Sequence, residues 1–226
     1  MKAMADNLQA VRDRIGRAAK AARRDAKAVS LLAVSKTHPA ARIAEAYAAG
    51  QRAFGENYVQ EAIEKMAALP PLEWHLIGPL QSNKTRLVAE RFDWVHTLDR
   101  EKVARRLSEQ RPAGLLPLKV LIQVNASAEA TKSGVAFAGV LELAKIVTSL
   151  PRLELRGLMA IPEPGAPRER YAEVRQAFER LKEALPVDTL SMGMSDDLEL
   201  AIEEGATMVR VGTAIFGQRR RERDAA

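Results

Sequence analysis

Two kinds of segment alternate along this chain. Short apolar runs are separated by longer stretches in which apolar residues recur every three or four positions. The runs cover residues 30–35, 52–54, 73–77, 93–97, 118–124, 154–160, 188–192 and 208–211. A run such as 118–124 is apolar at nearly consecutive positions, which is typical of parallel strands covered by helices. The pattern therefore predicts eight strands with helices between them.

Several of the intervening helices have recognisable ends. The expected helices are 4–28, 39–49 between Pro39 and Gly50, 99–110 capped by Asp99, and 195–204 between Ser195 and Gly205. The first of them is amphipathic and precedes the first strand.

Eight strand and helix units in 226 residues favour an α/β fold of the (β/α)8, or TIM barrel, type with an extra N-terminal helix. An open doubly wound sheet is the alternative. No linker rich in Pro, Gly or Ser divides the chain, so we expect one domain over 1–226, with a basic tail from about residue 218.

Composition excludes several function classes. The chain has no Cys, which rules out disulfides, thiolate metal sites and cysteine nucleophiles. The N-terminus lacks a signal sequence and no apolar stretch is long enough to span a bilayer, so we expect a cytoplasmic protein without membrane contact. The net charge of +6 raises the possibility of nucleic-acid binding, but aromatic residues are only 4% of the chain. Specific nucleic-acid binding is not expected.

Lys36 carries an amine at the end of the apolar run 30–35. An amine at the mouth of a buried strand is partly desolvated, which disfavours its charged form and leaves it able to form a Schiff base with a carbonyl compound. A strand-end lysine that simply reaches water is the alternative interpretation.

Polar residues gather where the other predicted strands end, which is where a barrel places its chemistry. They include Ser35, Glu56, Asn57, His75, Thr97, Asn125, Ser191, Ser195, Arg210 and Thr213. The loops after strands seven and eight contain Gly193, Ser195, Gly212 and Thr213, a set suited to binding a phosphate group.

A Schiff-base lysine facing a phosphate site leaves two ligand classes open, a phosphorylated sugar or pyridoxal phosphate. Arg210 interrupts an apolar run and could face the pyridine nitrogen of pyridoxal phosphate. His75 is equally compatible with a core position and a functional one. His38 and His96 have no metal-ligand spacing, so no metal site is expected.

Seven segments carry a family resemblance. They are 33–39 (AVSKTHP), 54–58 (FGENY), 74–84 (WHLIGPLQSNK), 124–125 with 132–134 (VN and KSG), 157–159 (GLM), 191–196 (SMGMSD) and 209–217 (VRVGTAIFG). In these segments the chain resembles the YggS/PROSC-type pyridoxal phosphate homeostasis proteins, single-domain relatives of the alanine racemase N-terminal barrel.

The resemblance implies a role for each matching residue. Lys36 would hold pyridoxal 5'-phosphate as a Schiff base, and Arg210 would face the pyridine nitrogen. The full cofactor-binding set that it implies is Lys36, Asn57, His75, Met159, Ser191, Ser195, Arg210, Gly212 and Thr213, with Ser195, Gly212 and Thr213 on the phosphate.

Whether such a protein catalyses a reaction is a separate question. The related racemases take a second acid/base group from an additional β domain and a dimer partner, and this chain ends about ten residues after its last matching motif. We therefore expect a monomeric cofactor carrier in pyridoxal phosphate homeostasis, without turnover and with apo forms of pyridoxal phosphate enzymes as candidate recipients. The alternatives are an amino-acid racemase or related enzyme, a cofactor-free Schiff-base aldolase and a basic nucleic-acid binder.

Overall fold

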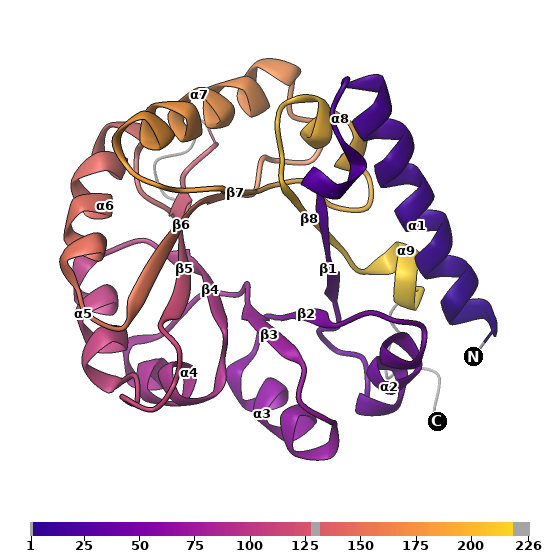
Figure 1. The fold of residues 1–226 in the computed structure, drawn as a ribbon, viewed down its shortest axis with the longest axis horizontal. Helices are drawn as coiled ribbons and strands as arrows, with labels where there is room; N and C mark the ends of the chain where they lie inside the picture. The colour runs from indigo at the N-terminus through magenta and orange to yellow at the C-terminus, as the bar shows by residue number, and fades with distance from the viewer. Residues whose placement is uncertain (1, 128–131, 219–226) are drawn as a thin grey trace.

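Eight parallel strands close into a barrel in the computed structural model, which describes residues 2–127 and 132–218 (Figure 1). The strands are β1 Ser30–Val34, β2 Ala53–Glu56, β3 Glu73–Leu76, β4 Trp94–Leu98, β5 Leu118–Val124, β6 Leu153–Ala160, β7 Thr189–Ser191 and β8 Met208–Val211. They pair in chain order, and β8 pairs with β1 through the register Leu32 to Arg210. The predicted barrel is confirmed and the open sheet is excluded.

Helices form a ring outside the strands (Figure 1). The α-helices are α1 Lys2–Ala21, α2 Ala40–Ala48, α3 Val59–Ala68, α4 Thr85–Arg91, α5 Glu101–Gln110, α6 Val140–Ser149, α7 Arg168–Ala184, α8 Leu198–Glu203 and α9 Thr213–Phe216. Short 3-10 helices lie at Ala26–Ala28, Ser82–Lys84 and Phe137–Gly139. Over the described residues, no helix combines the length and apolar character that crossing a membrane requires.

The first helix ends earlier than its apolar spacing predicts. The prediction of a helix over 4–28 is wrong beyond Ala21, because Arg23 adopts a left-handed φ of 55°. The amides of Arg23 and Arg24 then bond back to the carbonyls of Lys20 and Ala19, a helix-ending arrangement. The predicted basic tail lies outside the described residues from 219 onward.

Two predicted helix starts also need correction. Asp99 pairs with Arg100 at 2.6 Å and does not cap α5, which begins at Glu101. Ser195 lies in a turn, and α8 begins only at Leu198. Pro39 and Gly50 do flank α2 as predicted, with Gly50 at a φ of 90°.

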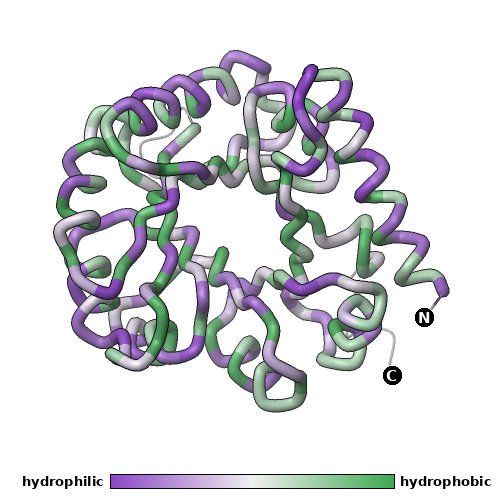
Figure 2. Tube along the Cα trace, viewed as in Figure 1, coloured by the Kyte–Doolittle hydropathy of each residue, from purple (hydrophilic) through white to green (hydrophobic). Residues whose placement is uncertain are grey.

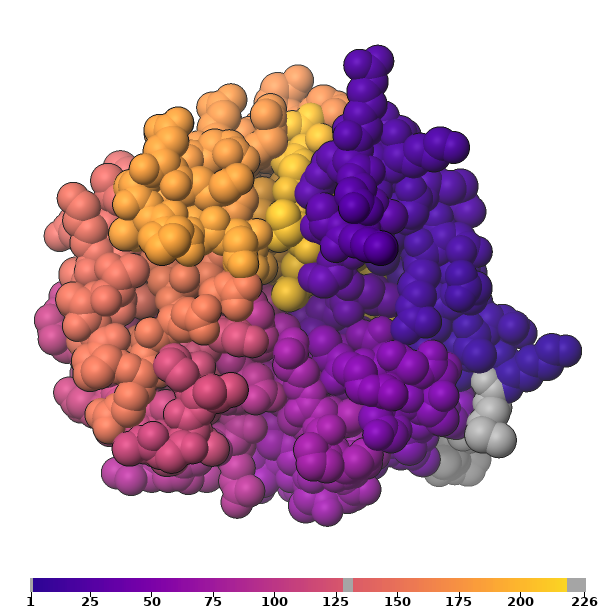
Figure 3. Space-filling view, viewed as in Figure 1, coloured from indigo at the N-terminus to yellow at the C-terminus, as the bar shows by residue number. Residues whose placement is uncertain are grey.

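The two faces of the barrel strands are packed differently. Alternate residues point toward the helices, where the main apolar core lies, and include Val209 and Val211 of β8. Hydrophobic residues follow the strands, whereas hydrophobic and hydrophilic residues alternate along the outer helices (Figure 2). Inside the barrel, Leu32 packs near Met208, and a separate apolar cluster contains Trp94. Side chains fill the centre of the ring in the space-filling view (Figure 3).

Candidate cofactor-binding site

A cavity of about 230 Å³ opens where the strands end at their carboxyl termini. Six of the nine residues predicted from the sequence line it: Lys36, Asn57, Ser195, Arg210, Gly212 and Thr213. They come from the segments after β1, β2 and β7 and from β8 and the segment after it. The barrel therefore gathers residues that are as far as 177 positions apart, from Lys36 to Thr213, around one space.

Lys36 is half-buried and follows β1 in a tightly bent segment. The amide of Ser35 donates to the carbonyl of Gly55 at 3.0 Å, which continues the pairing of β1 with β2. Thr37 then takes a left-handed φ of 66°, and its amide donates to the Glu61 carboxylate at 2.6 Å. The backbone is thus bonded to neighbouring elements on both sides of Lys36.

A buried ion pair supports this segment from the helix side. Lys65 of α3 donates to the carbonyl of Ser35 at 2.9 Å, to Glu56 at 2.7 Å and to Glu61 at 2.6 Å. The Ser35 hydroxyl donates to the same Glu56 oxygen at 2.6 Å. Burial raises the pKa of the Glu56 carboxyl, while Lys65 and Ser35 favour its ionised form. The polar groups behind Lys36 therefore fix the position of its backbone.

Ser195 lies on a loop that two helices, α1 and α7, hold in place. Arg14 of α1 donates to the Ser195 carbonyl at 2.9 Å and pairs with Glu199. Asp197 accepts from the amide of Met194 at 2.5 Å and from the Tyr171 hydroxyl at 2.6 Å. Burial, followed by the bond to Asp197, raises the pKa of Tyr171, so its hydroxyl keeps the proton that it donates.

The segment after β8 approaches β1 closely. A Cβ placed on Gly212 would lie 3.1 Å from the carbonyl oxygen of Val34, so glycine allows the two backbones to meet at the cavity. Thr213 follows as the first residue of α9. The first amides of a helix have no acceptor within it, which leaves them able to bind an anion together with the hydroxyls of Ser195 and Thr213.

Arg210 presents a buried guanidinium to the cavity. Its Nη1 donates to the carbonyl and to the hydroxyl of Ser191, both at 2.8 Å, and its Nη2 donates to the carbonyl of Ala160 at 2.9 Å. Burial lowers the pKa of Arg210 to about 10, which leaves it charged at neutral pH. Arginine has five N–H donors, so donors are left over for a ligand in the cavity.

The other three predicted residues lie deeper in the barrel. His75, Met159 and Ser191 are each fully buried and do not line the cavity. His75 stacks on Trp94 with ring centroids 5.1 Å apart, and Met159 packs in the same cluster as Trp94. Their contact with a cofactor stays a prediction.

The sequence alone does not predict some of the residues that position the site. Lys65, Arg14 and Tyr171 lie on helices at ordinary amphipathic positions, and their roles depend on which loop each helix packs against. For a metal ion, the described ranges 2–127 and 132–218 contain no group of three or more His, Asp or Glu residues placed to bind one.

Comparisons with known proteins agree with this geometry. The family model "Alanine racemase, N-terminal domain" matches residues 3–220. The chain is 61% identical to the pyridoxal phosphate homeostasis protein of Pseudomonas aeruginosa, covering 97% of both proteins. It is 40% identical to PipY of Synechococcus elongatus, in a structure with PLP bound, with a TM-score of 0.83 and coverage of 95% of this chain and 100% of PipY.

A more distant likeness concerns the fold alone. An alanine racemase of Clostridium difficile is 14% identical, with a TM-score of 0.75, and the match covers 98% of this chain and 58% of the racemase. The resemblance inferred from the seven sequence segments is confirmed by the nearer relatives. The chain belongs to the family of pyridoxal phosphate homeostasis proteins, which carry the alanine racemase N-terminal domain.

Proposed function

We propose that this protein binds pyridoxal phosphate reversibly, with a Schiff base at Lys36, and acts in pyridoxal phosphate homeostasis. The observation that carries the proposal is the convergence of Lys36, Arg210 and the two loops that bear Ser195 and Thr213 on one cavity. The cofactor has an aldehyde, a phosphate and a pyridine nitrogen, and the cavity has a group suited to each.

Each functional end of the cofactor has its own partner in the proposed site. The Nζ amine of Lys36 bonds to the aldehyde carbon, and the aldehyde oxygen leaves as water. The hydroxyls of Ser195 and Thr213, with the backbone at Gly212, bind the phosphate. The donors of Arg210 that are left over from its contacts to Ser191 and Ala160 face the ring nitrogen.

The choice of arginine supports a carrier role. When bound, pyridoxal phosphate supplies an electron sink for carbanion chemistry, and this sink is strongest when the ring nitrogen is protonated. Arg210 is charged at neutral pH and can only donate, so it leaves the nitrogen without a proton of its own. Arg210 therefore holds the ring while weakening its chemistry.

The relatives support the same ligand. A curated relative at 61% identity carries the name pyridoxal phosphate homeostasis protein, and PipY at 40% identity has a structure with PLP bound. We further propose that the protein is monomeric and cytoplasmic and that apo forms of pyridoxal phosphate enzymes receive its cofactor. Sedimentation at several protein concentrations tests the first of these, and transfer of cofactor to an added apo-enzyme tests the last.

An absorbance titration tests the proposed function. We expect added pyridoxal phosphate to give a visible Schiff-base band in the wild type and in a Lys20→Ala control, which removes an exposed lysine of α1. Lys36→Ala should lose this band. No change in the spectrum of the wild type would overturn the proposal, and sustained Lys36-dependent racemisation of an amino acid would replace the carrier by an enzyme.

A further inference from the structure

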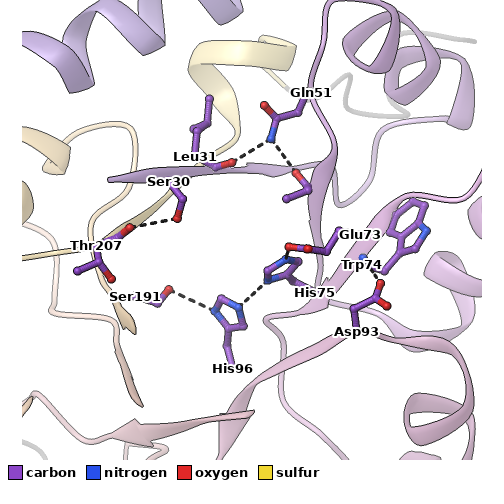
Figure 4. A network of polar contacts seen from close by, with 11 residues as sticks. Ser30, Leu31, Gln51, Glu73, Trp74, His75, Asp93, His96, Ser191 and Thr207 are labelled. Carbon is purple, nitrogen blue, oxygen red and sulfur yellow. Dashed lines mark hydrogen bonds and ion pairs between the residues drawn. The ribbon is translucent and has the colours of Figure 1, made fainter. Parts of the chain in front are cut away.

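Two histidines lie inside the barrel, away from the cavity wall. His75 of β3 and His96 of β4 are both completely buried. Their rings are joined by a contact of 2.9 Å between His75 Nδ1 and His96 Nε2. Figure 4 shows them in line between Glu73 and Ser191, which come from β3 and β7.

The contacts at the two ends of this pair complete a chain across the barrel. His75 Nε2 lies 2.7 Å from an oxygen of Glu73, and His96 Nδ1 lies 3.2 Å from the hydroxyl of Ser191. The same hydroxyl accepts from Arg210 at 2.8 Å. Glu73 begins β3 and keeps 44% of its side chain exposed, whereas Arg210 lines the cavity at the opposite end of the barrel.

The chemistry of Glu73 fixes the direction of every hydrogen bond. The bond from His75 lowers the pKa of Glu73, and a carboxylate can only accept, so the proton of this contact belongs to His75 Nε2. Burial lowers the pKa of His75, which keeps the ring neutral and makes its Nδ1 an acceptor. His96 must therefore donate from Nε2.

The hydrogen bonds between His96 and Arg210 run in the same direction. Burial also lowers the pKa of His96 well below its ordinary value, so His96 is neutral and its Nδ1 accepts. Ser191 then donates its hydroxyl proton to His96 and turns a lone pair toward Arg210, which can only donate. The direction required by the carboxylate at one end agrees with that required by the guanidinium at the other.

Arg210 depends on well-oriented hydrogen-bond acceptors, which such a chain can provide. Its direct contacts are to Ser191 and to the carbonyl of Ala160, all of them neutral acceptors. The Asp197 carboxylate favours the charged form of Arg210 but is not one of its hydrogen-bond partners, so the direct stabilisation of the guanidinium depends on how these neutral acceptors are oriented. The chain polarises the Ser191 hydroxyl so that its oxygen is the better acceptor.

We propose that Glu73, His75, His96 and Ser191 form a directed hydrogen-bond chain that positions Arg210 for its ligand in the cavity. This inference rests on the proposed function for the identity of that ligand. His75, His96 and Ser191 are thus positioning residues, acting on the cofactor site through Arg210. They link the ring-nitrogen end of the site to a carboxylate at the far end of the barrel.

Nitrogen NMR of the histidines in the cofactor-free protein tests the chain without any ligand. We expect both His75 and His96 to be neutral and to carry their proton on Nε2. A proton on Nδ1 of either ring, or a charged ring at neutral pH, would overturn the inference. This outcome is independent of cofactor binding, so it separates failure of the chain from failure of the proposed function.

Variants then test whether the chain acts on binding. Ser191→Ala removes the shared hydroxyl, and we expect it to weaken the affinity for pyridoxal phosphate about tenfold, the effect of one hydrogen bond. Ser191→Thr restores a hydroxyl and should recover affinity. Glu73→Gln removes the charge while keeping an acceptor, and should change the His75 nitrogen shifts and weaken affinity by a smaller factor than Ser191→Ala.

Glu154→Gln is the matched control. Glu154 is an exposed carboxylate near the start of β6, at the same end of the barrel, and it pairs with Arg156 at 3.5 Å rather than with a histidine. It should leave both the histidine spectrum and the affinity unchanged. Equal effects of Glu73→Gln and Glu154→Gln, or unchanged affinity in Ser191→Ala, would overturn the positioning role.

Discussion

The two faces of the eight barrel strands differ in the residues that they carry and in what those residues contribute. Toward the helices, residues such as Val209 and Val211 of β8 pack into one large apolar core. Toward the barrel interior, Arg210 on the same strand bonds to Ser191, and the polar chain continues through His96. Neighbouring residues of one strand therefore have different roles, because one side chain stabilises the fold and the next belongs to the binding site.

The difference follows from the space on each side. The layer between strands and helices buries apolar area from the whole ring, and this burial is the main stabilising contribution. The barrel interior is narrow, and the buried histidines are tolerated there because both are hydrogen-bonded, as His75 is to Glu73 and His96. Stability and ligand binding should therefore respond separately to changes on the two faces.

The largest expected loss of stability comes from the buried ion pair behind Lys36. Lys65→Met leaves Glu56 buried without its cation, and we expect the free energy of unfolding to fall by about 3–5 kcal/mol. Denaturant unfolding measures this loss. Replacing both partners, as Lys65→Met with Glu56→Leu, should recover most of it, and Lys182→Met at an exposed pair on α7 is the control. A loss below about 1 kcal/mol would contradict the assigned role.

An apolar change in the helix-facing layer should reduce stability alone. Leu107 of α5 is completely buried there, and Leu107→Ala should lower the free energy of unfolding by about 2–5 kcal/mol. The affinity of the folded protein for pyridoxal phosphate should not change. Leu116→Ala, at a side chain that is 82% exposed, should change neither quantity. If Leu107→Ala weakened binding as strongly as interior variants do, the separation of the two faces would be wrong.

An interior change should have the reverse effect. Arg210→Met replaces a buried charge by an apolar side chain of similar length, so the free energy of unfolding should change little. The affinity for pyridoxal phosphate should fall about 10- to 100-fold, because a charged hydrogen-bond donor is removed. Equilibrium titration of the absorbance band measures this affinity. An unchanged affinity would show that Arg210 does not contribute to binding the cofactor.

The smallest effect is a pH dependence that comes from the interior histidines. Burial lowers the pKa of His96 and His75 in the folded protein below 6.5, so the unfolded chain binds protons first as the pH falls. The stabilising contribution of the two neutral histidines is therefore fully present above about pH 6.5 and is lost as the pH falls below it, with a slope of at most about 1.4 kcal/mol per pH unit for each histidine.

The contribution of His96 to this pH dependence can be separated from the contributions of other titrating groups. Glu56 has a raised pKa and works in the opposite direction, so the informative quantity is the difference between the wild type and His96→Phe. Below about pH 6.5, His96→Phe should reduce the slope of unfolding free energy against pH by up to about 1.4 kcal/mol per pH unit. An unchanged slope would mean that His96 is charged in the folded protein.

Local sequence patterns predicted the strands well. The apolar runs placed all eight strands within two residues, because a buried parallel strand needs consecutive apolar positions. Helix ends were predicted less well, since they depend on tertiary contacts. Ser195 was expected to cap a helix, yet its carbonyl is bound by Arg14 and α8 begins three residues later.

The binding site was predictable only in part, for a similar reason. Lys36 and Thr213 follow strands, and the barrel places such residues together at one end. The hydrogen-bond chain through His96 was not predicted, because it depends on which strand faces point inward and on the closure that brings β4 near β7. Pairing of this kind leaves no local signal in the sequence.

The central claim is that Lys36 holds pyridoxal phosphate in this cavity. Borohydride reduction of the loaded protein, followed by proteolysis and mass spectrometry, tests it most directly. We expect one pyridoxyl group per chain on the peptide that contains Lys36, and none in Lys36→Ala. A label on another lysine, or bound cofactor that borohydride does not attach to the chain, would contradict the account.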